Sequence, residues 1–106
     1  MKKRFTRFAT VLAFVALPGM AFALGGRSAV WTHNASQQQC VADAEAAFAV
    51  SNLTDTRQGG AGTVWGDAGE YLVCAACTQG AASLTVMGPR QSVVDSLYER
   101  VRRNWH

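Results

Sequence analysis

The chain has 106 residues, with ten basic and seven acidic side chains, a net charge of +3 and three cysteines. Four of the basic residues lie within the first seven positions, so the chain from residue 24 onward has six arginines against seven acids, a net charge of −1. This balance removes the main electrostatic support for nucleic-acid binding, and the remaining length is enough for one small domain only.

The N-terminal segment has the pattern of a secretory signal peptide. An uncharged run of ten apolar residues follows the basic residues, and Ala21-Phe22-Ala23 supplies a small-residue cleavage pattern. A membrane span needs about 20 apolar residues, so this shorter run favours cleavage over anchoring. We expect cleavage after Ala23 and a single domain over 24–106, periplasmic or secreted, without a transmembrane segment. The chain after residue 3 lacks lysine and is rich in Ala, Gly and Arg, which indicates a bacterial coding sequence.

The first half of the mature chain predicts a strand, a helix and a loop. Residues 28–33 contain β-forming side chains and predict a short strand. Ser36 and Gln39 fit a capping box, which predicts a helix over 37–51. Its buried face would consist of small or apolar residues: Cys40, Ala44, Ala47, Phe48 and Ser51. Residues 52–63 contain three glycines and no hydrophobic period, which predicts a loop.

The second half predicts a β-meander and a second helix. Strands are expected at 64–66, 70–78 and 82–87, with glycine-containing turns between them. Pro89 is expected in the first turn of the helix, whose apolar stripe comprises Val93, Val94, Leu97, Tyr98, Val101 and Trp105. The order β-α-β-β-β-α predicts an α+β fold: a two-layer sandwich of a mainly antiparallel sheet with both helices on one face.

Cys74 and Cys77 have the spacing of a redox CxxC motif but not its context. A redox pair begins a helix, whose dipole lowers the thiol pKa, whereas these residues fall within a predicted strand. Residues three apart in a strand are separated by about 10 Å, more than the ~7 Å that a disulfide spans. Thr78 stands where covalent haem attachment needs histidine, and we expect no cofactor. Zinc binding by both cysteines with Cys40 and His33 is disfavoured, because the strand cysteines point to opposite faces.

Cys40 then has either Cys77 or Cys74 as its partner in an oxidising compartment. Strand parity places the two strand cysteines on opposite faces, and both faces are mostly apolar. A 40–77 bridge would stabilise the fold by about 4 kcal/mol in the chain-entropy model, and a 40–74 bridge by nearly the same. The residues alone leave both pairings open.

The chain also resembles a group of small exported bacterial proteins of unknown function. The shared pattern, over residues 36–105, is a helix cysteine, a glycine-rich loop, V-W-G-x-x-G-x-Y at 64–71, a strand ending in cysteine and a strand ending in Gly88-Pro89. In that pattern the cysteine that ends its strand pairs with the helix cysteine. The resemblance therefore implies a Cys40–Cys77 disulfide and a free thiol at Cys74, and it implies no catalytic residue.

Three residues are candidates for a binding surface: Trp65, beside the glycine-rich loop, and Arg100 and Arg103, on the exposed face of the last helix. No spacing of histidines, cysteines or carboxylates indicates a catalytic site. The preferred hypothesis is a non-enzymatic module that binds a protein or envelope component, as an inhibitor, an immunity-type protein or an accessory subunit. The alternatives are a thiol-dependent redox or intermolecular-disulfide role through Cys74, and a metal-binding module.

Overall fold

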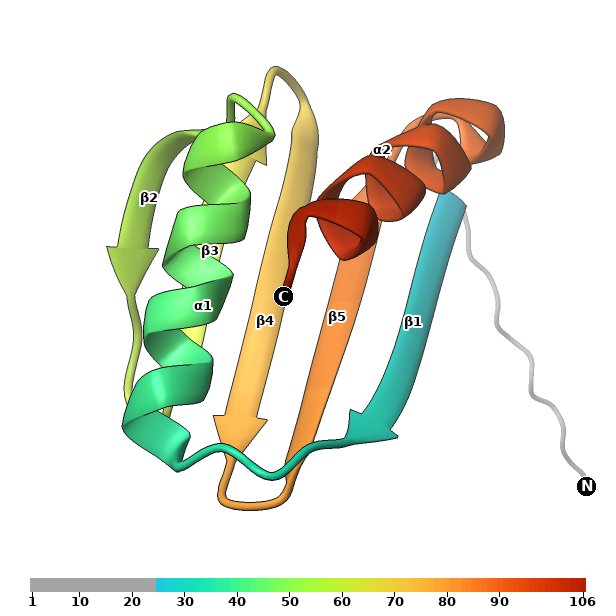
Figure 1. Ribbon diagram of the computed structural model, residues 1–106. Coiled ribbons are helices and arrows are strands. Elements are labelled where there is room, and N and C mark those ends of the chain that lie inside the picture. Colours follow the sequence, from blue (N-terminus) through green and yellow to red (C-terminus); the bar gives the residue numbers. More distant parts are fainter. Residues whose placement is uncertain (1–24) are drawn as a thin grey trace, which may run out of the picture.

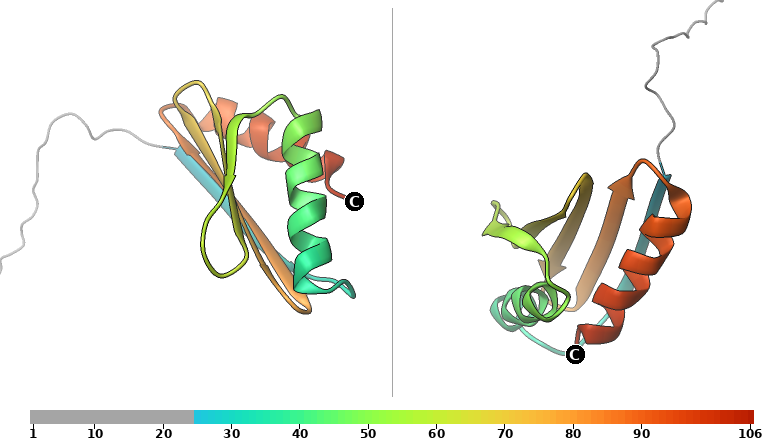
Figure 2. Two further views of the ribbon diagram at one scale, coloured as in Figure 1. Left: turned by 90° about the vertical axis from the view of Figure 1, so that its left-hand side faces the viewer. Right: turned by 90° about the horizontal axis from the view of Figure 1, so that it is seen from above.

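The computed structural model describes residues 25–106, which form an antiparallel sheet with two helices packed on one face (Figures 1 and 2). The sheet has five strands in the order β1-β5-β4-β3-β2. This confirms the predicted α+β fold class. No helix of the described part is both long and apolar enough to cross a membrane. The predicted signal peptide, residues 1–23, lies outside the described residues.

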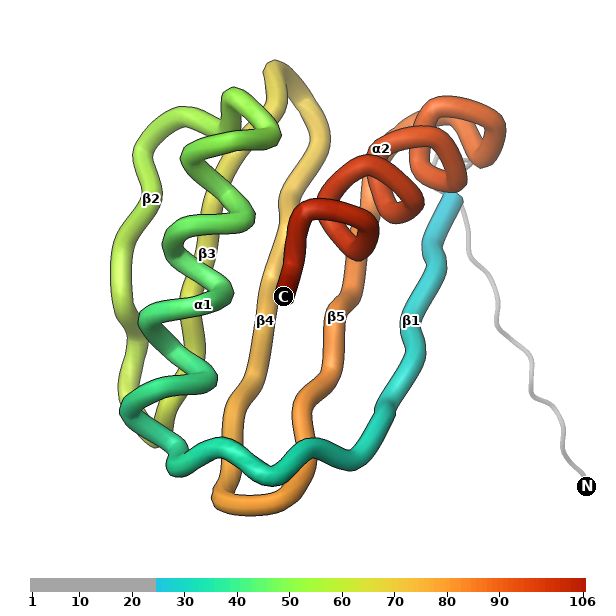
Figure 3. The backbone as a smooth tube through the Cα atoms, viewed as in Figure 1, coloured from blue at the N-terminus to red at the C-terminus, as the bar shows by residue number. Residues whose placement is uncertain are grey.

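In chain order the elements are β1 (Gly25–Thr32), α1 (Gln37–Val50), β2 (Thr54–Gln58), β3 (Thr63–Ala68), β4 (Tyr71–Thr78), β5 (Ala81–Gly88) and α2 (Gln91–Asn104). The tube in Figure 3 shows how β1 leads into α1: the connection runs along one end of the sheet, past β5 and β4. As a result α1 packs over β2, β3 and β4, while α2 packs over β5 and β1.

The helix α1 begins as its cap residue predicts. The Ser36 Oγ accepts a hydrogen bond from the Gln39 N–H at 3.1 Å, which satisfies one of the free amides of the first turn. The reciprocal half of the predicted capping box is missing, because the Gln39 side chain donates to Asp43 instead. The buried face of α1 is Cys40, Ala44, Ala47 and Phe48, and its small residues let the helix lie close to the sheet.

The meander of β3, β4 and β5 has two-residue turns whose glycines have positive φ, +61° at Gly69 and +101° at Gly80. Side chains alternate between the two sides of the sheet, so Val73, Ala75 and Cys77 of β4 face the helices and are fully buried. The opposite side of the same strands is half-buried or exposed. We call this side, which no described helix covers, the open face.

The segment predicted as a loop, 52–63, contains the additional strand β2. All five residues of β2 are exposed, and the strand pairs with β3 through its backbone. Because its five side chains are polar and exposed, β2 has no apolar alternation, and hydrophobic periodicity therefore does not detect it. The register shifts between Thr54 and Arg57, and Asp55 has a positive φ of 53°.

The helix α2 starts two residues later than predicted. Pro89 precedes the N-cap residue Arg90 and is not in the first turn. The stripe of α2 packs as expected, with Val94, Leu97, Tyr98 and Val101 buried. Arg27 of β1 lies 4.2 Å from the centre of the Tyr98 ring. It also pairs with Glu99 at 2.7 Å, which ties β1 to α2.

Candidate functional site

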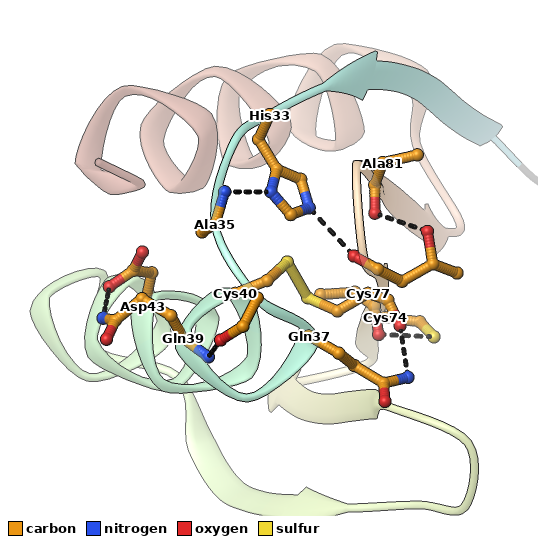
Figure 4. Close-up of a disulfide and its surroundings, with 12 residues drawn as sticks. His33, Ala35, Gln37, Gln39, Cys40, Asp43, Cys74, Cys77 and Ala81 are labelled. Carbon is orange, nitrogen blue, oxygen red and sulfur yellow. Dashed lines mark hydrogen bonds between the residues drawn. A yellow bond between two sulfur atoms is a disulfide. The ribbon is translucent and has the colours of Figure 1, made fainter.

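A disulfide joins Cys40, in the first turn of α1, to Cys77, at the end of β4 (Figure 4). The two Cα atoms are 5.8 Å apart, within the usual range for a disulfide. This is the pairing that the sequence resemblance implies. The two residues are 3% and 0% exposed, so the bond is shielded from solvent and from thiol reagents.

Polar contacts enclose the end of β4 that carries the disulfide. The Gln37 Nε2 donates to the Cys77 carbonyl at 2.9 Å, and the Cys77 N–H donates to the Gly62 carbonyl at 2.9 Å. Gly62 has a positive φ of 79°, and a Cβ there would lie 2.5 Å from the Cys77 carbonyl oxygen. Gly62 of the glycine-rich loop is therefore packed against the end of β4 that carries the disulfide, which gives this glycine a structural role.

His33 is held by both ring nitrogens in the same region (Figure 4). The Ala35 N–H donates to Nδ1 at 3.0 Å, so Nδ1 carries no proton. Nε2 then donates to the Thr78 carbonyl at 3.0 Å. Neither nitrogen is free to act as a base or a metal ligand, and the imidazole connects the β1–α1 loop to the β4–β5 turn.

A pocket of about 250 Å³ lies next to the disulfide, between the two helix ends. The Trp31 and Trp105 rings meet edge to face with centroids 5.0 Å apart, and the Arg102 guanidinium lies 3.9 Å above Trp31. The carboxylate of Asp43 already accepts from Gln39. Ligand pockets are commonly about 300–1,000 Å³, so this one is small, and it brings no nucleophile and base together among the described residues.

Cys74 is the free cysteine, and it lies on the open face. It is directly opposite Trp65 in a non-hydrogen-bonded pair, where Cα atoms are about 4.5 Å apart. Burial raises the pKa of the Cys74 thiol above its ordinary value. A raised pKa reduces the thiolate fraction near neutral pH, and the thiolate is the reactive form.

The two cysteines of β4 therefore lie on opposite faces of the sheet. Cys77 points to the helices and is bonded, whereas Cys74 points away, so the two have no shared site. The four residues considered as zinc ligands cannot bind one ion together. Cys40 and Cys77 form the disulfide, and both ring nitrogens of His33 are engaged in hydrogen bonds. Residues 25–106 contain no group of three His, Cys, Asp or Glu side chains placed to hold a metal ion.

The open face is the side of the sheet on which neither described helix packs. Its centre is apolar or small, and its exposed large apolar members are Val30, at 73%, and Met87, at 43%. A hollow of about 200 Å³ runs between Val30 and Ala76, above the small Ser83 side chain. The residues of this face include Ser28, Val30, Thr63, Trp65, Leu72, Cys74, Ala76, Ser83, Thr85 and Met87.

The β2–β3 hairpin bounds the open face at one edge. The Trp65 indole is half-buried under the hairpin loop, where a Cβ on Gly59 would lie 2.9 Å from the indole nitrogen. Beside it Arg57 bridges Asp55 and Asp67, with nitrogen-to-oxygen distances of 3.3 and 3.4 Å. The apolar centre thus has a charged rim on the β2 side, the arrangement found in many protein interfaces.

The three binding residues proposed from the sequence do not share one surface. Trp65 lies on the open face, whereas Arg100 and Arg103 are exposed on α2, in the other layer of the molecule (Figure 2). Of the open-face residues, Trp65 was predicted as a binding residue and Cys74 as a free thiol, whereas Leu72 and Met87 were not predicted as site residues. Their alternation along β4 and β5 was visible in the sequence, but it did not show which side the helices cover.

No protein-family model, curated protein or solved structure matches the chain. The resemblance to small exported bacterial proteins therefore stays a prediction from the sequence.

Proposed function

We propose that this chain is an exported, disulfide-stabilised module that binds another protein through its open face and catalyses no reaction. In this proposal residues 1–23 are a cleaved signal peptide, and residues 24–106 work in the bacterial periplasm or outside the cell. The observation that carries it is the uncovered apolar surface around Trp65, Leu72 and Met87, on a domain whose other sheet face is already closed by two helices and a disulfide.

The disulfide supports the choice of compartment. Structural disulfides persist in oxidising compartments and are rare in a reducing cytosol. A buried Cys40–Cys77 bond therefore fits an exported protein. The basic and apolar N-terminal pattern ending in Ala23 agrees with the same route.

The shape and chemistry of the open face support binding over catalysis. A flat sheet surface with an apolar centre and a charged rim matches a protein partner better than a small substrate, which needs a concave site. The polar groups near the disulfide are bonded to one another or to the backbone, so they do not converge on an empty position. An inhibitor, an immunity-type protein or an accessory subunit would each use such a surface.

A thiol-dependent role through Cys74 has weaker support. Its raised pKa keeps the thiol protonated near neutral pH, and its sulfur is half-buried beside Trp65. A buried, neutral thiol in a protein interface contributes as a small apolar group. We therefore assign Cys74 to the binding surface.

Affinity capture from the cell envelope tests the binding proposal with a matched pair of variants. Met87→Arg puts a charge on the open face, and Val50→Arg makes the same change at another exposed apolar site, at the end of α1. We expect a protein captured by the wild-type chain and by Val50→Arg but lost with Met87→Arg, while circular dichroism shows both variants folded. Equal capture by Met87→Arg, or no specific protein captured by the wild type, would contradict the proposal.

Export is tested separately on the chain recovered from cells. The expected N-terminal residue is Leu24, and the denatured chain should have one reactive thiol without reductant and three with it. An intact N-terminus, or three thiols in the absence of reductant, would contradict export into an oxidising compartment.

A further inference from the structure

The outer edge of β1 presents a row of backbone groups that pair with no described strand. β1 is an edge strand of the sheet formed by residues 25–106 (Figure 1). Its register with β5 is regular over eight residue pairs. The His33 N–H donates to the Gly80 carbonyl on the β5 side. Hydrogen-bonding directions alternate along an antiparallel strand. The backbone N–H and C=O groups of the odd-numbered residues Arg27, Ala29 and Trp31 therefore also point toward β5. The backbone N–H and C=O groups of the even-numbered residues point outward, away from the sheet.

The first of these outward residues is capped by a side chain. The Gly26 N–H donates to the Gln91 Oε1 at 2.9 Å, and the Gln91 Nε2 donates to the Gly26 carbonyl at 3.1 Å. The carboxamide of Gln91 thus makes the two hydrogen bonds that a neighbouring strand would make. This closes the edge at Gly26 and leaves Ser28, Val30 and Thr32 open along the described part of the chain.

The two edges of the sheet differ in their protection. β2 is short, shifted in register, charged and has a residue with positive φ, which are features that prevent a strand from pairing with another molecule. β1 is longer and regular, and its charged residue Arg27 is bound to Glu99 on the helix side. At the centre of its open stretch, Val30 is 73% exposed.

We infer that β1 pairs with β1 of a second copy of this chain, antiparallel and about a two-fold axis at Val30. In that register Ser28 lies opposite the second copy's Thr32, and the two Val30 residues lie opposite each other. All three open residues of each copy exchange N–H and C=O hydrogen bonds, and the valine side chains cover each other on the open face. The pairing joins two five-stranded sheets into one and continues their open faces.

The ends of the open stretch favour a second copy over a longer strand from another protein. In the two-fold register Gly26 lies opposite residue 34 of the other copy, beyond Thr32, where β1 ends. The Gln91 cap therefore stays in place in both copies, whereas a longer partner strand would have to displace it. Each copy uses its one open stretch in this contact. The pairing therefore forms a closed dimer and cannot extend into a longer assembly.

The dimer should be weak, because three residue pairs bury a small area and interfaces below about 1,200 Å² form transient complexes. Sedimentation equilibrium of the exported chain from about 10 µM to about 1 mM covers the matching range of affinity. We expect concentration-dependent dimerisation. A chain that is monomeric throughout this range would overturn the inference.

Two substitutions at Val30 test the geometry. Val30→Pro removes a backbone N–H that does not bond to β5, and proline is tolerated at such edge positions. Val30→Lys keeps the backbone intact and places a charge at the two-fold axis. Each should weaken the dimer about tenfold or more. Val50→Lys, the same change at an exposed valine of α1 that lies away from β1, should leave dimerisation unchanged. A dimer that survives both Val30 variants would overturn the assigned register.

Hydrogen exchange adds a measurement that does not rely on substitution. The amides of Ser28, Val30 and Thr32 should exchange slowly at high protein concentration and rapidly at low concentration, while the alternate amides of Ala29 and Trp31 stay protected at both. Uniform behaviour of all five amides would contradict the pairing. A monomeric chain that still binds its envelope partner would overturn this inference alone, and a dimer without a partner would overturn only the proposed function.

Discussion

The two faces of the sheet are built from the same strands and differ in what covers them. On β4 the residues Val73, Ala75 and Cys77 are fully buried under the helices, while their immediate neighbours Leu72, Cys74 and Ala76 are half-exposed on the open face. Both sets are mostly apolar. The residues that stabilise the fold are therefore concentrated on the helix side, where the disulfide lies, whereas the apolar residues of the open face remain accessible.

The largest difference between the faces should appear when their cysteines are removed. Cys40→Ala combined with Cys77→Ala opens a loop of about 38 residues and should lower the free energy of unfolding by about 4 kcal/mol. Cys74→Ser, on the open face, should change it by less than about 0.5 kcal/mol, as surface substitutions usually do. Urea unfolding under non-reducing conditions measures both. Equal losses for the two variants would contradict the division between the faces.

Truncation of apolar side chains should repeat the contrast on a single strand. Leu84 of β5 is fully buried, and Leu84→Ala should cost about 2–5 kcal/mol because it removes core contacts and leaves a cavity. Met87 of the same strand is 43% exposed on the open face, and Met87→Ala should cost less than about 1 kcal/mol. Thermal and urea unfolding check both values. A large loss of stability in Met87→Ala would mean that the open face also contributes to the stability of the fold.

Glycine substitution tests how closely α1 approaches the sheet. A Cβ on Gly66 would lie 2.9 Å from the Phe48 ring, so Gly66→Ala should cost about 1–3 kcal/mol through overpacking. A Cβ on Gly60 would have no neighbouring atom within 4 Å, so Gly60→Ala serves as the control. The comparison is made by urea unfolding of both variants. If Gly66→Ala were as stable as Gly60→Ala, the helix would lie farther from β3 than described.

The smallest effect concerns the ionisation of Cys74. Burial raises the thiol pKa in the folded chain, so above the pKa of an unperturbed thiol, about 8.5, the unfolded chain ionises first and folding is disfavoured. The contribution of the Cys74 thiol to the free energy of unfolding is fully present below that pH. It is lost as the pH rises through the pKa of the thiol in the folded chain. Melting temperatures between about pH 7 and pH 10 should therefore fall more steeply for the wild type than for Cys74→Ser. Parallel curves would contradict the shift.

Much of the fold could be predicted because its elements have side-chain periodicity. The Ser36 cap, the buried stripe of α2 and the alternation of β4 each depend on local residues. β2 could not be predicted, because its five exposed residues are ordered by backbone pairing with β3. The first residues of β1 escaped detection for a related reason. Gly25 has no β-forming side chain, and it fits there because a Cβ would lie 2.7 Å from the Gln91 Cα.

The candidate site was less predictable than the fold. Strand parity separated Cys74 from Cys77, but both faces of β4 are apolar, so the residues alone did not identify which one the helices cover. Trp65 was a candidate because of its neighbouring glycines, and Arg100 and Arg103 because of their charge. Only the packing of the two layers shows that the tryptophan and the arginines lie on different sides of the molecule.

Site-specific photo-crosslinking in cells tests most directly whether the open face binds a partner. A benzophenone side chain at position 87 probes the open face, and one at position 100 probes the exposed surface of α2. We predict a crosslink to a different envelope protein from position 87 and none to that protein from position 100; a crosslink to a second copy is recognised by its mass. Crosslinking to an envelope protein from position 100 alone, or from neither position, would contradict the proposal.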